Sequence, residues 1–567
     1  MKIISEKSIS GKMWVLDGDA VGGGDIVGSI LERRGISDDE AKRIFLNPSL
    51  MGQMPDPNVL KGMAEAVQIV ADFIKTKKKI AIFGDYDVDG ITSAAILIKF
   101  LKELDADVIW HLPDREAEGY GLNAASVNDF AKEGAGLLIT VDCGTGAAAE
   151  VAAAKKLGMK VVVTDHHDAV ENLPDADAFI NPKQKGDESG LDYLAGVGVA
   201  FMFLVALNRA LGHPVSDMMG FLDLVALGTI CDTMPLLGLN RAIVKTGLKV
   251  LERRGNVGLC ALMESARVKK ADVYAAGFML GPRLNAAGRI IDANLALDLI
   301  LTDNRIMADG LAEKLNEMNA RRQAIQNKIL LDADDMAKGR KDAGAFCLYV
   351  SGDDWHGGVM GIVAGRLKEK YGLPCCVATR SKTAVNGSGR SIDGVDIGKI
   401  IHLALAEGII YAGGGHKAAA GFELSPENEN KFADFLDKEV KAALNGIHPL
   451  PKVNIDIEMD AGGANAELAA NLEKLAPFGI GNREPTLCLY GGVWTFGRRI
   501  GSGAHLSGNL KTSTGNLSVV GFNLSDTPAG RFLLDESNFG CKISAAGRLK
   551  ENDFSSDVQL LLEDIAL

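Results

Sequence analysis

The stretch FGDYDVDGITSA, residues 83–94, places aspartates at alternate positions: Asp85, Asp87 and Asp89. The stretch follows the apolar run 80–83 and leads into 91–104, which has the composition of a helix. Carboxylates this close along the chain repel one another unless positive charge lies among them. Carboxylate oxygens are ligands of divalent cations, so the spacing indicates a metal site where a strand passes into a helix.

Two later strand-like runs also end in residues that can bind a metal. Run 136–141 is followed directly by Asp142, and run 160–164 is followed by Asp165, His166 and His167. Side chains at the carboxyl ends of parallel strands meet at one edge of the sheet, where ligands bind. Each aspartate taken alone has a second interpretation, as the N-cap of the next helix. Their coincidence on three strands favours a shared site.

A fourth segment extends the candidate site. The apolar helical stretch 222–236 carries Asp223 and Asp232, and an unpaired carboxylate is costly in a buried segment. Asp232 lies where Pro235 predicts the end of the helix, so Asp232 is favoured as the ligand and Asp223 as a supporting or solvated residue. Oxygen ligands alone would suit Mg²⁺ or Ca²⁺, and imidazole beside them shifts the preference to Mn²⁺, with Zn²⁺ and Co²⁺ as competitors. Several carboxylates also suggest two ions, about 3.5–4 Å apart, as in two-metal phosphoryl transfer.

The elements that must position these residues follow from periodicity. Short β-branched runs alternate with helical runs between residues 78 and 164, which predicts an α/β fold with a parallel sheet. The expected parts are a helical segment over 1–78, a parallel-sheet domain with a helical extension over 79–305, a long connecting helix over 306–340, a smaller α/β domain over 341–447 and a β-barrel over 453–567.

Composition is that of a globular protein, with 47% hydrophobic and 24% charged residues. The formal net charge of −13 argues weakly against a nucleic-acid partner, although only local charge matters at a site. We find no signal peptide and no apolar run long enough for a membrane helix. The eight cysteines show no CxxC pair, which fits free thiols in the cytoplasm.

The motifs resemble a known family over about residues 45–565. FGDYDVDG, ITVDCG, VTDHH and ALGTICDTMPL are similar, in this order, to the motifs of DHH phosphoesterases. PDREAEGYGLN, GPRLNAAGRI, NGSGRSIDG and YAGGGHKAAAGF resemble the bacterial RecJ exonucleases. The resemblance implies a DHH domain, a DHH-associated domain and an OB-fold barrel. It also implies metal-dependent 5′-to-3′ hydrolysis of single-stranded DNA in repair and recombination.

The same resemblance assigns roles by position. The implied metal ligands are Asp87, Asp89, Asp142, His166 and Asp232, and Asp85 binds directly or through water. His167 and Asp165 receive catalytic roles, His167 on a ligand carboxylate or the scissile phosphate and Asp165 in orienting the histidines. DNA contacts are expected from Arg115, Arg283, Asn285, Arg289, Ser388, Arg390 and His416. Residues 387–391, GSGRS, are expected to form a Gly/Ser turn that cradles a phosphate through its N–H groups.

The alternatives are a DHH phosphoesterase for oligoribonucleotides or small nucleotides, and a catalytically inactive scaffold that binds single strands. The 453–567 barrel argues against the first, and the intact ligand set argues against the second. The expected partners of a monomeric enzyme are single-stranded DNA, a helicase and a single-stranded-DNA-binding protein.

Overall fold

The computed structural model describes residues 2–5, 7–16, 25–115, 118–169, 172–290, 293–552 and 557–567. The chain divides into two compact units. Unit 2 contains residues 47–324 and 477–483, and unit 1 contains residues 1–46, 325–476 and 484–567. In the described part of the chain, no helix combines the length and the apolar character needed to cross a membrane.

Unit 2 is built on a five-stranded sheet whose strands all run parallel. In spatial order the strands are β4 (Val108–His111), β3 (Ile80–Gly84), β5 (Leu137–Val141), β6 (Lys160–Thr164) and β7 (Ala178–Ile180). The central strands β3 and β5 are buried along their whole length, as expected of a parallel sheet covered on both faces. The predicted parallel sheet is confirmed, and β7 is an additional edge strand.

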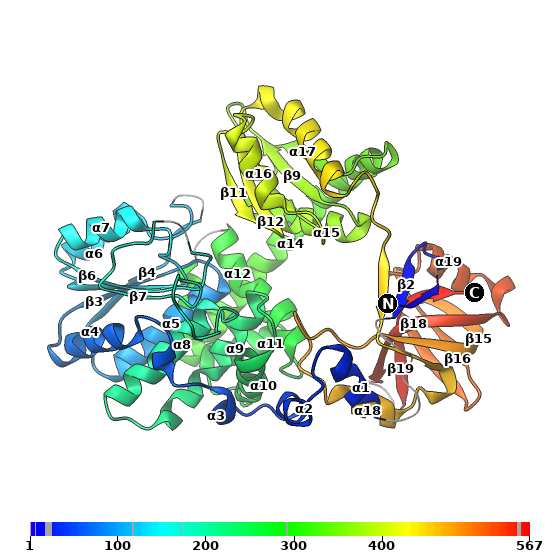
Figure 1. Cartoon of the computed structure of the whole chain (residues 1–567), viewed down its shortest axis with the longest axis horizontal. Helices are drawn as coiled ribbons and strands as arrows, with labels where there is room; N and C mark the ends of the chain where they lie inside the picture. The colour runs from blue at the N-terminus through cyan, green and yellow to red at the C-terminus, as the bar shows by residue number, and fades with distance from the viewer. Residues whose placement is uncertain are drawn as a thin grey trace. The chain divides into compact units, whose positions relative to one another are not determined.

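Helices cover both faces of this sheet (Figure 1). On one face lie α4 (Met63–Lys75), α5 (Val88–Glu103) and α8 (Gly196–Ala210), and on the other lie α6 (Ala124–Lys132) and α7 (Ala148–Lys156). Alternate residues of β3 serve the two layers: Ile80 and Ile82 join the core with α5 and α8, and Ala81 and Phe83 join the core with α6 and α7.

The rest of unit 2 is helical. Helix α9 (Leu222–Cys231) is apolar almost all round and packs against α5, α8 and α10 (Gly238–Glu252). After α10 come α11 (Val257–Ser265), the π-helix η3 (Ala275–Leu280), α12 (Gly281–Ile290) and α13 (Asn294–Leu301). The smaller helices are α3 (Leu50–Gln53), η1 (Pro57–Val59) and η2 (Val215–Phe221).

Helix α14 (Arg305–Asp342) has 38 residues and continues from unit 2 into unit 1. It begins one residue before and ends two residues after the predicted helix 306–340. Its first half buries Ala312 and Leu315 in the core of unit 2, and its second half buries Ala333 and Ala337 against unit 1. One apolar stripe therefore serves two separate cores.

Unit 1 contains a second α/β sheet in the order β11 (Ala412–His416), β12 (Ala419–Leu424), β10 (Val385–Arg390), β9 (Cys375–Arg380) and β8 (Leu348–Asp353). Helices η4 (Gly357–Val359), α15 (Met360–Tyr371), α16 (Ile397–Ala406), η5 (Pro426–Asn428) and α17 (Glu429–Ala443) accompany it. The prediction of a Gly/Ser turn over 387–391 is wrong for 387–390, which lie in β10. There the backbone pairs with β9 and β12, so its N–H groups serve the sheet.

A β-barrel follows, as predicted. Its strands are β15 (Leu487–Ile500), β16 (His505–Lys511), β17 (Asn516–Gly521), β19 (Val558–Ala566) and β18 (Lys542–Glu551), and pairing of β15 with β18 closes it. β14 (Ile457–Asp460) pairs in parallel with the first part of β15. The accompanying helices are η6 (Ala461–Gly463), α18 (Ala466–Glu473), α19 (Pro528–Leu534) and η7 (Glu536–Asn538).

The N-terminal segment was expected to be helical, but it also contains two strands. β1 (Lys2–Ser5) and β2 (Met13–Leu16) form a sheet with β13 (Lys452–Ile455). Trp14 is fully buried, and its Nε1 donates a hydrogen bond to Oδ2 of Asp564 in β19 at 3.0 Å. A short strand whose partner lies more than 400 residues away gives no local sequence signal. Helices α1 (Ile26–Arg33) and α2 (Asp39–Leu46) follow.

Candidate metal centre

The three alternating aspartates lie in the loop that leads from β3 into α5. Asp87 is the N-cap of α5, and its Oδ1 accepts hydrogen bonds from the backbone N–H groups of Asp89 and Gly90 at 3.0 and 3.1 Å. Oδ1 of Asp85 accepts from Tyr86 N at 2.7 Å. The capping and metal interpretations are therefore compatible, because capping occupies only one of the two carboxylate oxygens of Asp87.

Asp89 points from the first turn of α5 to the N-terminus of α8. Its two carboxylate oxygens accept from Gly196 N at 2.7 Å and Val197 N at 2.9 Å. Backbone N–H groups at a helix N-terminus stabilise negative charge, so α8 holds this buried carboxylate in a fixed orientation. The approach is close: a Cβ atom at position 196 would collide with Oδ1 of Asp142. Glycine at this position therefore allows both carboxylates to lie beside α8.

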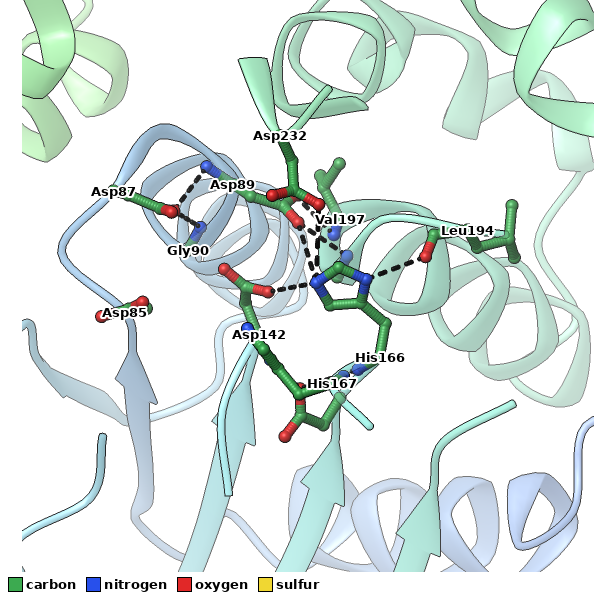
Figure 2. Close-up of polar contacts among 12 residues, drawn as sticks. Asp85, Asp87, Asp89, Gly90, Asp142, His166, His167, Leu194, Val197 and Asp232 are labelled. Carbon is green, nitrogen blue, oxygen red and sulfur yellow. Dashed lines mark hydrogen bonds and ion pairs between the residues drawn. The ribbon is translucent and has the colours of Figure 1, made fainter. Parts of the chain in front are cut away.

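His166 lies among three of the predicted carboxylate ligands (Figure 2). Its Nδ1 lies 3.0 Å from the carbonyl oxygen of Leu194, which makes Nδ1 the donor and leaves the lone pair on Nε2. Nε2 lies 3.2 Å from Oδ1 of Asp142, 3.6 Å from Oδ2 of Asp232 and 3.8 Å from Oδ2 of Asp89. Four segments that are distant in sequence thus converge within one coordination sphere.

The protonation states of this cluster indicate that a cation is needed. Burial, with the charge of His167, lowers the pKa of His166 to about 4, so the ring is neutral at neutral pH. Nε2 of His166 and Oδ1 of Asp142 are both buried, and neither has a hydrogen-bond partner among the described residues. Two electron-pair donors that face each other at 3.2 Å are unfavourable unless a positive charge binds both.

The carboxylates give the same indication. Burial and the neighbouring charge of Asp87 raise the pKa of Asp89 to about 7, and burial with the charge of Asp89 raises the pKa of Asp232 to about 8. Burial also raises the pKa values of Asp85 and Asp142 well above the usual range of a carboxyl group. Such a cluster binds protons unless divalent cations replace them.

The potential ligand atoms form three overlapping groups, and within each group all of these atoms lie within 4.8 Å of one another. One group is Asp89, His166 and Asp232, a second is Asp85, Asp87 and Asp142, and a third is Asp142, His166 and His167. Asp142 belongs to two groups, and its backbone has a φ of 59°, in the left-handed region that is uncommon for a non-glycine residue. Carboxylates together with imidazole suit Mn²⁺ or Mg²⁺, and several overlapping groups are compatible with two ions.

His167 lies at the edge of this cluster, with 37% of its side chain exposed. Its Nδ1 lies 2.8 Å from Oδ1 of Asp165, whose other oxygen accepts from Thr145 N at 2.9 Å. Burial alone would lower the pKa of His167, but the hydrogen bond and the charge of Asp165 raise it to about 9. His167 is therefore protonated at neutral pH. In this structure it bonds Asp165, where a ligand carboxylate had been one of two expected partners.

Sequence reasoning did not find Tyr120, whose hydroxyl lies 3.1 Å from Nε2 of His167. The loop between β4 and α6 that carries Tyr120 is held by Glu118. This carboxylate accepts from Asp114 N at 3.0 Å and Asn123 Nδ2 at 2.8 Å and lies 2.9 Å from His111 Nε2. The GYG sequence around Tyr120 was visible, but only the fold shows that it reaches His167.

Three arginines gather beside the aspartate loop. The guanidinium of Arg115 lies 5.5 Å from the centre of the Tyr86 ring. Burial and the nearby charges of Arg115 and Arg322 lower the pKa of Arg289 to about 10, while Asp87 acts in the opposite direction. Arg322 is buried in α14, and its guanidinium Nη2 donates to Asn319 Oδ1 at 2.9 Å. This cationic cluster beside the ligands suits a phosphate.

The other predicted residues of unit 2 lie in different settings. Arg283 donates from Nε to Asn316 Oδ1 at 3.0 Å and from Nη1 to the carbonyl of Met279 at 2.6 Å, which ties α12 to α14. Asn285 is half-buried in α12. Asp223 lies in the first turn of α9, nine residues before the ligand candidate Asp232, and belongs to none of the three ligand groups. The structure thus separates Asp223 from the cluster.

The predicted phosphate contacts of unit 1 lie on neighbouring strands. Ser388 and Arg390 are two residues apart on β10, so they share one face of the sheet. Arg390 and His416 pair with the same residue of the intervening strand, Ala419. The Arg390 guanidinium Nη1 donates to the carbonyl of Gly389 at 2.8 Å. Sheet register, not a turn, therefore brings these side chains together.

Comparison with known proteins identifies the family. Three family models match the chain: the DHH family, N-terminal domain over residues 79–229, the DHHA1 domain over 343–442 and the RecJ OB domain over 455–564. The single-stranded-DNA-specific exonuclease RecJ of Bacillus subtilis (strain 168) is 33% identical over 549 residues, covering 96% of this chain and 68% of the relative. The chain belongs to the RecJ family.

Further RecJ proteins are similar to this chain in sequence and in structure. The single-stranded-DNA-specific exonuclease RecJ of Haemophilus influenzae (strain Rd) is 33% identical over 83% of this chain and 85% of its own length. The crystal structure of RecJ in complex with Mn²⁺ from Thermus thermophilus superimposes with a TM-score of 0.79 at 30% identity, covering 95% of this chain and 75% of that one. RecJ from the same organism in complex with Mg²⁺ has a TM-score of 0.72 at 28% identity.

Proposed function

We propose that this member of the RecJ family is a metal-dependent exonuclease that hydrolyses phosphodiester bonds of single-stranded DNA. The observation that carries the proposal is the convergence of three carboxylates on one imidazole, from the first turn of α5 and the ends of β5, β6 and α9, with two buried ligand atoms that have no hydrogen-bond partner among the described residues. The RecJ relatives named for this activity, and the Mn²⁺- and Mg²⁺-bound RecJ structures, support it.

The proposed metal ligands are Asp85, Asp87, Asp89, Asp142, His166 and Asp232. When bound, Mn²⁺ or Mg²⁺ supplies an activated water and neutralises charge on the phosphate. The chain itself fixes the direction of the donors: α8 orients Asp89, and the carbonyl of Leu194 orients His166. These backbone contacts arrange the site before substrate binds, which reduces the reorganisation needed for catalysis.

His167 is the proposed electrophilic residue. Asp165 holds it protonated, and Nε2 of this partly exposed ring donates toward a phosphate oxygen on which negative charge develops. The Tyr120 hydroxyl contacts the same nitrogen. A bound phosphate oxygen would either replace this hydroxyl at Nε2 or accept a hydrogen bond from it as well. Arg115, Arg289 and Arg322 lie on the side of Asp87 and Tyr86, where they attract the substrate backbone.

Several finer assignments extend this proposal. Digestion runs 5′ to 3′, and the enzyme acts in DNA repair and recombination in the cytoplasm, as a monomer that works with a helicase and a single-stranded-DNA-binding protein. Ser388, Arg390 and His416 contact phosphates, as do Arg283 and Asn285. The domain divisions at 79–305, 341–447 and 453–567 also belong to this proposal, and the three family matches lie inside them.

Labelled oligonucleotides test the function directly. With Mn²⁺, the full chain should release labelled mononucleotides at once from a 5′-labelled single strand and only late from a 3′-labelled one. The same strand in a blunt duplex should be degraded far more slowly. Asp89→Ala should abolish release in both cases. Faster cleavage of oligoribonucleotides than of DNA would favour the other DHH phosphoesterase activity, and binding without any cleavage would favour a scaffold.

A further inference from the structure

The outer face of η3 carries two exposed aromatic rings that no role described above uses. Tyr274 and Phe278 are 65% and 70% exposed. Their rings stack on each other, with centroids 5.3 Å apart and planes inclined by 20°. Burying such rings is favourable, and two stacked rings left in water form a flat apolar platform. A π-helix is rare and often occurs at functional sites.

A basic run precedes this platform in the chain. Arg267, Lys269 and Lys270 are all exposed, and in the described part of the chain none of them forms an ion pair. Two carboxylates lie near the end of the run, and both bind backbone N–H groups: Asp272 accepts from Ala275 N at 2.7 Å, and Glu252 accepts from Ala271 N. Three exposed cations in close succession stand out in a chain whose net charge is −13.

The platform is tied to the metal centre through the opposite face of η3. Ala275, Ala276 and Leu280 are buried, and Sγ of Cys231 donates to the carbonyl of Ala276 at 3.7 Å. Cys231 directly precedes the ligand candidate Asp232. The rings therefore lie across η3, about one helix diameter (~10–12 Å), from the residue that precedes Asp232. A single strand held at the ligands can reach across this distance with its neighbouring nucleotides.

We propose that Tyr274 and Phe278 form a base-stacking platform for single-stranded DNA, and that Arg267, Lys269 and Lys270 contact the phosphates beside it. Exposed aromatic rings beside cations are the combination by which single strands are bound without sequence preference, because every base has a face that stacks. The inference rests on the proposed function, and it adds a binding site in unit 2 to the phosphate contacts proposed above.

Binding measured without metal tests the platform separately from cleavage. The probe is an oligo(dT) of about 20 nucleotides, longer than the site of one OB-fold, with 2-aminopurine placed at successive positions. Tyr274→Leu/Phe278→Leu should weaken binding about tenfold and remove the fluorescence quenching at one probe position. Tyr274→Phe/Phe278→Tyr should retain both. Met51→Ala, which removes a side chain that is 94% exposed elsewhere in unit 2, should also change neither.

The basic run has its own measurement, which holds if the leucine variant does not fold. Lys269→Ser/Lys270→Ser alters only exposed side chains. Because two phosphate contacts are lost, the negative slope of log affinity against log salt should become less steep by about 1.4. Unchanged affinity and quenching in the leucine variant would overturn the platform, and would favour a protein partner for this face. An unchanged salt slope would overturn the phosphate contacts. Absence of metal-dependent cleavage by the unaltered chain would instead count against the proposed function.

Discussion

Nε2 of His166 and Oδ1 of Asp142 lie 3.2 Å apart in the interior of unit 2, and in the part of the chain that the structure describes neither atom has a hydrogen-bond partner. Nδ1 of the same ring is engaged by the Leu194 carbonyl, so Nε2 cannot resolve the contact by donating a proton from the neutral tautomer. A cation between the two atoms removes the conflict. This one relationship makes the cluster a metal centre with testable consequences.

Asp142→Asn should separate metal affinity from folding. An amide can donate to Nε2 of His166, and it removes one buried negative charge, so the metal-free variant should melt no lower than the unaltered chain. Mn²⁺ affinity, measured by calorimetry, should fall by about 100-fold or more. The matched control is Asp223→Asn, another buried aspartate of unit 2, which should bind Mn²⁺ normally. Equal affinity losses in the two variants would show that the cluster does not hold the metal.

The carboxylates predict how stability without metal depends on pH. Their pKa values rise on folding from the ordinary value of 3.8 to about 7 for Asp89 and about 8 for Asp232, so the unfolded chain releases these protons first. Their contribution to stability is therefore fully present below pH 3.8 and is lost as the pH rises to about 8.

The melting temperature measured in chelator should accordingly fall as the pH rises from 3.8 to about 8. The pH dependence of the melting temperature of Asp89→Asn/Asp232→Asn is subtracted to isolate the effect of these two groups. Added Mn²⁺ should raise the melting temperature more at the alkaline end, where no proton competes for the ligands. A metal effect that is largest at acidic pH would contradict the assignment.

Asp165→Asn should act through His167. Without the carboxylate, the pKa of His167 should fall from about 9 toward or below that of a free imidazole, because burial is no longer opposed. The alkaline limit of kcat/KM should move to lower pH, and the rate at pH 8 should fall by about 10²-fold or more. Direct titration of the His167 ring by NMR checks the cause. An alkaline limit that stays in place would mean that another group sets it.

Gly196→Ala tests the close approach of α8 to the ligands. The added methyl group would collide with the Asp142 carboxylate, and moving α8 away would break the hydrogen bonds from Gly196 and Val197 to Asp89. We expect weaker Mn²⁺ binding and a loss of about 1–3 kcal/mol in the free energy of unfolding. Gly310→Ala in α14 is the control, because the added Cβ would meet no described atom of another part of the structure within 4 Å. This variant should be neutral or stabilising by up to about 1 kcal/mol. Indistinguishable melting curves and affinities for the two variants would refute this account.

Much of the site could be predicted because it is built at the ends of strands. Asp85, Asp142 and His166 each follow a short apolar run, and the geometry of a parallel sheet brings such positions to one edge. Asp232 could be predicted because a carboxylate at the end of an apolar helix needs a partner. These are local signals, and the alternation of strands and helices converts them into proximity.

The tertiary structure decided what local pattern does not contain. The strand β10 looked like a turn because its glycines favour turns, and only pairing with β9 and β12 makes it extended. The strand β2 depends on Trp14, whose partner Asp564 is distant in the chain. The tautomer of His166, the charge of His167 and the contact of Tyr120 likewise depend on groups brought together by folding. The sequence by itself determined which side chains can bind a metal, and the fold decided their protonation and direction, because both depend on burial and on neighbours from other segments.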